Sequence, residues 1–220
     1  VSTSDGEYVT TTGLIPKSGT WSYSQSSKNY MPFGFGHQFS QKGYKTLAYH
    51  NYLYSYYDRD QSHPNMGYDF YGVGNGLEVK NTWPQSDLEM MEKTIPDALA
   101  SGTPFHNYYM TVSGHCRYNL MGGNKMSSKN KDKVADLPYS NTVKAYIACN
   151  LELEKGLTAL GRQLEEAGIA DDTVIVMAPD HYPYGLGKAW GLKHDGLAEL
   201  YGVDKYDLFQ RDKNTLILWS

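Results

Sequence analysis

The chain has 220 residues, of which 40% are hydrophobic and 20% charged, a composition typical of one folded domain rather than of a disordered chain. The net charge of -4 at pH 7 leaves no basic excess to neutralise a phosphate backbone, so we expect no nucleic-acid partner. Cys116 and Cys149 form no CxxC pair, which argues against a zinc-thiolate site and leaves a single disulfide open.

The first half of the chain alternates between predicted helices and strands. Ser4-x-x-Glu7 matches a capping box and predicts a helix at the amino terminus. Residues 44–50 read as a short strand. Residues 86–101 predict a helix, with Ser86 as its N-cap and Pro96 as a possible break.

The middle of the chain continues this alternation. Residues 104–113 predict a buried strand, and the Gly-, Lys-, Ser- and Asn-rich residues 119–138 predict a surface loop. Residues 141–167 predict the longest helix, because apolar residues recur at spacings of three and four, and Gly168 suits its carboxyl end. The lysine run 125–133 fits a solvated loop or a contact with anionic lipid.

Two apolar runs near the carboxyl end, residues 173–178 and 215–219, predict strands. Between them, residues 182–212 read as a long insertion carrying short helices such as 196–201. The order of elements favours an α/β fold with a mainly parallel or mixed sheet sandwiched by helices, in a single domain over residues 1–220.

Polar side chains follow three of the predicted strands. Asp180 and His181 follow residues 173–178 and could bind a divalent cation, although a helix cap and a surface histidine would look the same. His115 follows residues 104–113. Arg59 follows the strand that ends at His50 and could bind a phosphate or sulfate, or form an ion pair with a neighbouring aspartate.

Thr3 lies at the start of the first predicted helix, where the helix dipole and free N–H groups favour an anion. Its hydroxyl is a poor nucleophile unless a metal activates it, and Thr3 could simply cap the helix. If these strand ends and Thr3 meet, they suit metal-assisted transfer or hydrolysis of a phosphate or sulfate ester.

Four segments resemble, in the same order, motifs of the extracellular catalytic domain of lipoteichoic acid synthases and related phosphoglycerol transferases. These enzymes form a sulfatase-like group of the alkaline phosphatase superfamily. The segments are residues 3–8 (TSDGEY), 43–60, 111–118 (TVSGHCRY) and 174–182 (VIVMAPDHY).

The resemblance implies an alkaline phosphatase/sulfatase-like fold and a site with assigned roles. Thr3 would be the nucleophile and a metal ligand, with Asp180 and His181 completing the ligands for Mn²⁺ or Mg²⁺. Substrate-binding residues would be His50, Tyr57, Arg59 and His115. The reaction would transfer a phosphoglycerol-type head group from a phospholipid to a glycopolymer acceptor through a phospho-threonine intermediate.

The resemblance also implies a place at the extracellular face of the bacterial membrane, reached through a membrane anchor in a segment not present here. The family's remaining metal ligand is a glutamate on an upstream strand, so we expect this sequence to be an N-terminally truncated fragment. Tyr52 replaces an acidic residue of the family pattern, and Cys116-Arg117 replaces a proline-containing segment.

Two alternatives remain open at this point. One is a phosphodiester or sulfate ester hydrolase of the same superfamily, although a threonine in place of the formylglycine precursor disfavours sulfatase chemistry. The other is a non-catalytic module that binds cell-wall polymer, because the 20 tyrosines suit contacts with sugars, if they are more than compositional drift. We expect His37, His106 and His194 to be structural or surface histidines, and His63 to shape a loop, although it could also reach substrate.

Overall fold

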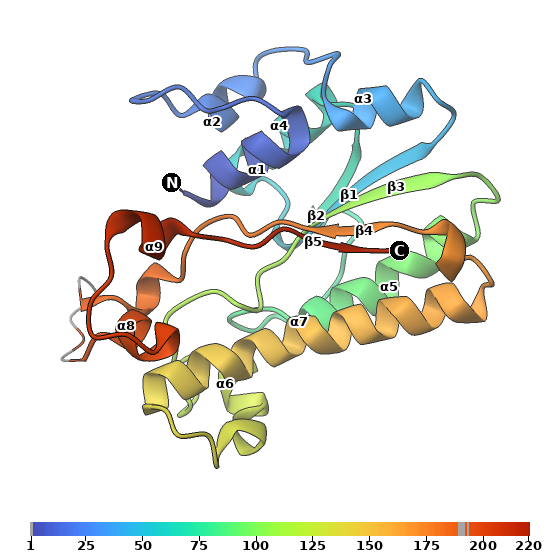
Figure 1. Cartoon of the computed structure of the whole chain (residues 1–220). Helices are drawn as coiled ribbons and strands as arrows, with labels where there is room; N and C mark the ends of the chain where they lie inside the picture. Colours follow the sequence, from blue (N-terminus) through green and yellow to red (C-terminus); the bar gives the residue numbers. More distant parts are fainter. Residues whose placement is uncertain (1, 189–191, 193) are drawn as a thin grey trace.

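The computed structural model describes residues 2–188, 192 and 194–220. A small parallel sheet lies between two groups of helices (Figure 1). Helices α1 to α4 cover one face of the sheet, and α5 and α7 cover the other. This arrangement confirms the predicted α/β class with a sheet between helices.

The sheet consists of β1 (Lys45–Leu53), β2 (Asp69–Val73) and β3 (Phe105–Met110), in the order β2-β1-β3. Both neighbours run parallel to the central strand β1. The parallel direction brings the carboxyl ends of all three strands to one edge of the sheet. The predicted strands at 44–50 and 104–113 are therefore confirmed, although most of β3 is half-buried rather than buried.

Side chains of β1 alternate between two cores, as the pleat of a strand requires. Leu47 and Tyr49 face α5 (Asp87–Leu99) and α7 (Asn141–Glu166). Ala48 faces the opposite core, which four helices from the first part of the chain cover. These are α1 (Thr3–Thr12), α2 (Ser22–Ser26), α3 (Phe35–Ser40) and α4 (Arg59–Asn65).

The two long helices have the ends that the sequence predicts. The Ser86 hydroxyl accepts a hydrogen bond from the Glu89 N–H at the start of α5. Helix α7 ends just before Gly168, which adopts φ +70°. The break predicted at Pro96 is wrong, because α5 continues past it and the flanking Ile95 and Ala98 are buried in the core.

The segment predicted as a surface loop, 119–138, contains α6 (Lys125–Lys129) and the 3-10 helix η2 (Lys131–Val134). Both pack against α7, because Met126 and Val134 are buried apolar residues that need a partner. Lys129 is held by the buried carboxylate of Glu152, at 2.6 Å. The prediction of a solvated loop was therefore wrong, although the lysines of this segment remain exposed.

The last strands, β4 (Ile175–Met177) and β5 (Ile217–Trp219), pair antiparallel with each other. Within the described residues they form a separate two-stranded sheet and do not extend β2-β1-β3. The remaining short elements are η1 (Tyr56–Asp58), η3 (Ala170–Asp172), η4 (Tyr184–Leu186), α8 (Gly196–Tyr201) and α9 (Leu208–Asp212). Helix α8 confirms the short helix predicted at 196–201.

A search for membrane-spanning segments in the described part of the chain finds no helix with the length and apolar character that crossing a bilayer requires.

Candidate active site

Thr3 is the first residue of α1, with Ser2 as the N-cap. The Asp5 carboxylate accepts a hydrogen bond from the Ser2 N–H at 3.0 Å, which fixes the first turn. The predicted capping box of Ser4 and Glu7 is wrong, because the helix begins earlier and Glu7 is buried. The Thr3 hydroxyl therefore lies at the helix N-terminus, where the dipole favours a negative charge.

The structure brings Thr3 together with Asp180 and His181, which lie just beyond β4. Thr3 Oγ1 is 3.3 Å from His181 Nε2, although the two residues are 178 positions apart. The same Nε2 is 3.2 Å from Asp180 Oδ2. The three predicted metal ligands thus converge on one point.

The tautomer of His181 follows from its other contact. Its Nδ1 is 2.8 Å from the Tyr182 carbonyl oxygen, which can only accept, so Nδ1 carries the proton and donates. In the neutral ring, Nε2 then presents a lone pair to the Asp180 carboxylate. This lone pair, the Asp180 carboxylate and the Thr3 hydroxyl oxygen are all groups that can bind a metal cation.

The donor set suits a divalent cation. A hydroxyl, an imidazole nitrogen and a carboxylate are ligands for Mn²⁺, and a backbone carbonyl on the second histidine nitrogen is the usual support for a metal-binding histidine. Among the described residues, no group of three or more His, Cys, Asp or Glu side chains could hold a metal. The side chains that would hold a metal at this site are those of Thr3, Asp180 and His181.

Gly6 lets α1 approach this segment closely. A Cβ atom at Gly6 would lie 2.6 Å from the Asp180 Cα and 2.7 Å from its carbonyl oxygen, both backbone atoms that cannot step aside. Gly6 of the TSDGEY segment thus allows a short distance between α1 and the Asp180-His181 segment. Sequence reasoning missed this role.

Glu7 anchors α1 from the buried side. Its carboxylate accepts hydrogen bonds from Arg59 Nη2 at 2.8 Å and Nε at 3.0 Å, and lies 3.0 Å from His63 Nε2. Burial alone raises the pKa of Glu7, but Arg59 and His63 outweigh it and hold this pKa at about 2. His63 is therefore part of a buried cluster around Glu7, which corrects its prediction as a residue that shapes a loop.

Arg59 is only 1% exposed, and its Nη1 donates to the Tyr56 carbonyl oxygen. Its pKa is raised: burial acts to lower it, and the Glu7 carboxylate outweighs burial. The structure thus places Arg59 against Glu7, which lies one turn of α1 after Thr3. A contact between Arg59 and the substrate stays a prediction.

His50 is a buried residue near the carboxyl end of β1, and its Nδ1 lies 2.9 Å from the Met110 carbonyl oxygen on β3. Burial, with the charge of Arg59, lowers the pKa of His50 to about 3, so the ring is neutral at physiological pH. His50 can therefore contribute hydrogen bonds to a substrate but no positive charge.

Tyr57 and Asp58 both have a left-handed backbone, with φ +62° and +57°. Such conformations cost free energy for non-glycine residues, about 1–3 kcal/mol each, and cluster where a loop presents side chains to a ligand. The Tyr57 ring lies 5.4 Å from the Trp21 ring and 5.2 Å from the Arg59 guanidinium.

His115 is exposed, after the end of β3. Hydrogen bonds to Cys116 raise the pKa of His115, while the nearby His181 opposes the rise, so the two histidines are electrostatic neighbours. Both Cys116 and Cys149 are free and buried, which removes the disulfide that the sequence left open.

A continuous row of aromatic rings borders the site, with neighbouring ring centroids 4.3–5.5 Å apart. The rings belong to Trp21, Tyr57, Tyr56, Tyr52, Trp83 and His115, in that order. Trp21 donates to the Ser4 hydroxyl at 2.8 Å, so the row begins beside Thr3 and ends at His115. Trp21 and Trp83, which the sequence analysis did not single out, are 47% and 40% exposed and can contact a ligand.

The other histidines have structural partners. His106 stacks on Phe39 and lies 3.0 Å from the Tyr68 hydroxyl, and His37 lies 3.2 Å from the Asn65 carbonyl oxygen. His194 is an exposed partner of Glu199 at 2.9 Å. These contacts agree with the expectation that these three histidines lie outside the site.

Comparison with known proteins gives a consistent family. The sulfatase family model matches residues 1–204. The chain is 26% identical over 145 residues to lipoteichoic acid synthase 1 of Bacillus subtilis (strain 168), covering 64% of this chain and 22% of that protein. It is 22% identical to the lipoteichoic acid synthase-like YvgJ of the same organism, over 98% of this chain and 34% of that protein.

The crystal structure of the lipoteichoic acid synthase LtaP from Listeria monocytogenes has the same fold. The TM-score is 0.68 at 23% sequence identity, covering 81% of this chain and 44% of that one. The chain thus spans about a third or less of the length of the curated relatives. The predicted alkaline phosphatase/sulfatase-like fold is confirmed.

Proposed function

Since this chain belongs to the sulfatase family, we propose that it transfers a phosphoglycerol-type head group from a phospholipid to a cell-envelope glycopolymer, with Thr3 as the nucleophile. One observation carries the proposal: the Thr3 hydroxyl, at the N-terminus of α1, contacts His181 Nε2 at 3.3 Å beside the Asp180 carboxylate. The lipoteichoic acid synthases among the proteins that it resembles support this choice of substrate class.

In the proposed reaction, Thr3 Oγ1 attacks phosphorus, the Thr3 proton is released, and diacylglycerol leaves with a proton from solvent. The product is a phosphoglycerol ester on Thr3, which an acceptor hydroxyl then attacks to regenerate threonine. Mn²⁺ or Mg²⁺ held by Thr3, Asp180 and His181 would supply a lowered pKa for the threonine hydroxyl.

The other predicted residues would hold the donor. His115 lies at the open end of the aromatic row and would contact the phosphate oxygens. His50 would donate or accept a hydrogen bond as a neutral imidazole, and the Tyr57 ring would lie beside the head group. Arg59 would stabilise the negative charge of the phosphate from the buried side of the site. The protein would work at the extracellular face of the membrane, anchored by a segment outside this sequence.

Hydrolysis is the second candidate, because the exposed His115 leaves this side of the site open to water. Water would then replace the glycopolymer in the second step, and the same Thr3 ester would form. A phosphodiester is the expected substrate of such a hydrolase, since Thr3 cannot become the formylglycine that sulfatases use.

The test uses the full-length protein with vesicles of fluorescent phosphatidylglycerol, with and without Mn²⁺. Thr3→Ala should reduce diacylglycerol release by at least about 10³-fold, whereas Thr158→Ala, at an exposed position of α7, should leave the rate unchanged. Mass spectrometry should find the phosphoglycerol adduct on the peptide that contains Thr3.

Undiminished release by Thr3→Ala, or an adduct on another residue, would refute the nucleophile assignment. Release of free glycerol phosphate at the full rate, with no product on an added acceptor, would establish the hydrolase instead. Thr3→Ser should retain part of the activity, because it keeps the hydroxyl at the helix N-terminus.

A further inference from the structure

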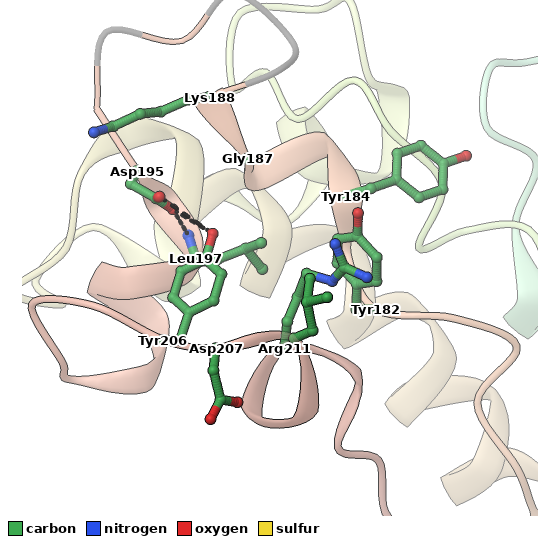
Figure 2. A pocket seen from close by; sticks show the side chains of 10 residues that line it. Tyr182, Tyr184, Gly187, Lys188, Asp195, Leu197, Tyr206, Asp207 and Arg211 are labelled. Atoms are coloured by element: carbon green, nitrogen blue, oxygen red, sulfur yellow. Dashed lines mark hydrogen bonds between the residues drawn. The ribbon is translucent and has the colours of Figure 1, made fainter. Parts of the chain in front are cut away.

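A cavity of about 280 Å³ lies beside the candidate active site, between the segment that follows His181 and the helices α8 and α9 (Figure 2). Three tyrosines contribute to its wall: Tyr182, Tyr184 and Tyr206. None of the residues assigned above to catalysis or to donor binding lines it.

The cavity shares a wall with the active site. The Tyr182 carbonyl accepts the Nδ1 proton of His181 at 2.8 Å, and the Tyr184 ring lies 4.6 Å from the His181 ring. A ligand in the cavity would therefore lie against the segment that positions His181, whose Nε2 contacts the Thr3 hydroxyl at 3.3 Å.

The polar groups of the cavity are held in place before any ligand binds. The Tyr206 hydroxyl donates to the Asp195 carboxylate at 3.2 Å, and Asp195 also caps α8 by accepting from the Leu197 and Ala198 N–H groups. The Arg211 guanidinium lies over the Tyr182 ring, 4.4 Å from its centroid (Figure 2). Fixed groups of this kind reduce the entropy lost on binding.

The charges of the cavity balance. Lys188 and Arg211 are matched by Asp195 and Asp207, and Arg211 is also paired with Asp212 at 2.8 Å. A phosphate would face two carboxylates without an excess of positive charge. Hydroxyl groups can instead donate to the carboxylates and accept from the cations, so the lining suits a neutral polyhydroxyl compound.

The tyrosines add to this preference, because a tyrosine ring has an apolar body with a polar edge, which matches the apolar face and the hydroxyl rim of a sugar ring. Arg211 already covers part of the Tyr182 ring, and the Tyr184 ring lies against His181. The volume is at the small end of ligand pockets, which span roughly 300–1,000 Å³. It is too small for a lipid with two acyl chains.

We infer that this cavity binds an uncharged sugar unit of the acceptor glycopolymer. The inference rests on the proposed function for the identity of the acceptor, whereas sugar binding itself can be tested without turnover. The position of the cavity beside His181 would bring the acceptor chain close to the Thr3 ester.

The experiment titrates the full-length Thr3→Ala protein with cellobiose, a neutral glucose disaccharide, followed by isothermal titration calorimetry. We expect saturable binding with a Kd of about 1 mM, typical of a small contact area. Tyr182→Leu, which keeps bulk but removes the ring face, should weaken binding about tenfold. Phe209→Leu, on α9 with a side chain 80% exposed and outside the cavity, should leave binding unchanged.

Tyr206→Phe keeps the ring and removes one hydroxyl, so it tests the cavity if Tyr182→Leu fails to fold; it should weaken binding about threefold. Absence of saturable binding, or equal binding by all variants, would overturn the inference. Inorganic phosphate that binds more tightly than cellobiose and competes with it would also overturn it. If diacylglycerol release fails in the wild-type protein while Tyr182→Leu still lowers sugar affinity, the proposed function falls and the sugar site stands.

Discussion

Replacing Glu7 with glutamine tests whether α1 is anchored by a buried ion pair. Arg59 donates to the Glu7 carboxylate at 2.8 and 3.0 Å, and both side chains are at most 1% exposed. Glutamine keeps the shape of the side chain but leaves Arg59 as a buried cation without a counter-charge. We expect Glu7→Gln to lower the free energy of unfolding by about 3–5 kcal/mol.

The pH dependence of this effect has a defined sign. The pKa of Glu7 falls from its ordinary value of 4.5 to about 2 in the folded protein. The stabilisation is therefore present above pH 4.5 and is lost as the pH falls toward 2. At about 1.4 kcal/mol per pKa unit, the difference corresponds to about 3 kcal/mol, which agrees with the cost of breaking the pair.

The assay is urea unfolding of the wild type and Glu7→Gln, followed by circular dichroism from about pH 7 to about pH 3. The control is Glu166→Gln, which breaks an exposed pair with Arg162 at 3.7 Å and should cost less than about 0.5 kcal/mol. The gap between wild type and Glu7→Gln should narrow as the pH falls. A gap no larger than that of the control, or one that is constant with pH, would refute the reasoning.

Three further predictions concern the site itself. Gly6→Ala would push a methyl group against the Asp180 backbone, and we expect it to lower the free energy of unfolding by about 1–3 kcal/mol. The melting temperature and the rate of head-group release should fall with it. Gly161→Ala, which meets open space on α7, should instead stabilise by about 0.5–1 kcal/mol. Mn²⁺ at about 100 times its Kd should raise the free energy of unfolding by about 2.7 kcal/mol; a rise that survives His181→Ala in thermal unfolding would place the metal elsewhere. His50, whose pKa is about 3, should give the NMR signals of a neutral imidazole down to about pH 4, and a titration near its ordinary value would contradict its burial.

The sequence predicts the framework of the site well, because local patterns carry the necessary information. Helix α7 and strand β1 follow from their apolar patterns, and polar residues follow the strands at one edge of a parallel sheet. Thr3, Asp180 and His181 meet as expected, although no local pattern links Thr3 to the end of β4. Here the resemblance to known motifs supplied the pairing that periodicity cannot.

Glu7 shows why the rest of the site could not be predicted. A serine three positions before a glutamate has the spacing of a capping box, so the local pattern points to a helix start. The partner that decides the role of Glu7 is Arg59, 52 positions away, and only the folded chain brings them together. A buried ion pair has no signature in the sequence around either residue.

The segment that contains α6 is helical because of its packing, although its composition predicts a loop. Its lysines and glycines favour a loop, but the isolated Met126 and Val134 are enough to fix it against α7. The reverse holds for β4 and β5, whose apolar runs suggest interior strands. Val176 is 58% exposed and Leu218 is 66% exposed, because these strands pair only with each other within the described residues.

Helix α1 joins stability to the proposed chemistry. Positions 3, 6 and 7 lie on neighbouring parts of its surface, since residues three and four apart face the same way. Thr3 contacts His181, Gly6 leaves room for the Asp180 backbone, and Glu7 binds Arg59 on the buried side. We therefore expect a change at Glu7 to shift the helix that carries the Thr3 hydroxyl, and a displacement of about 1 Å can reduce the rate about 10²-fold. The anchoring ion pair should thus affect head-group release at temperatures where the variant is still folded, and this would separate a positioning role from simple stabilisation.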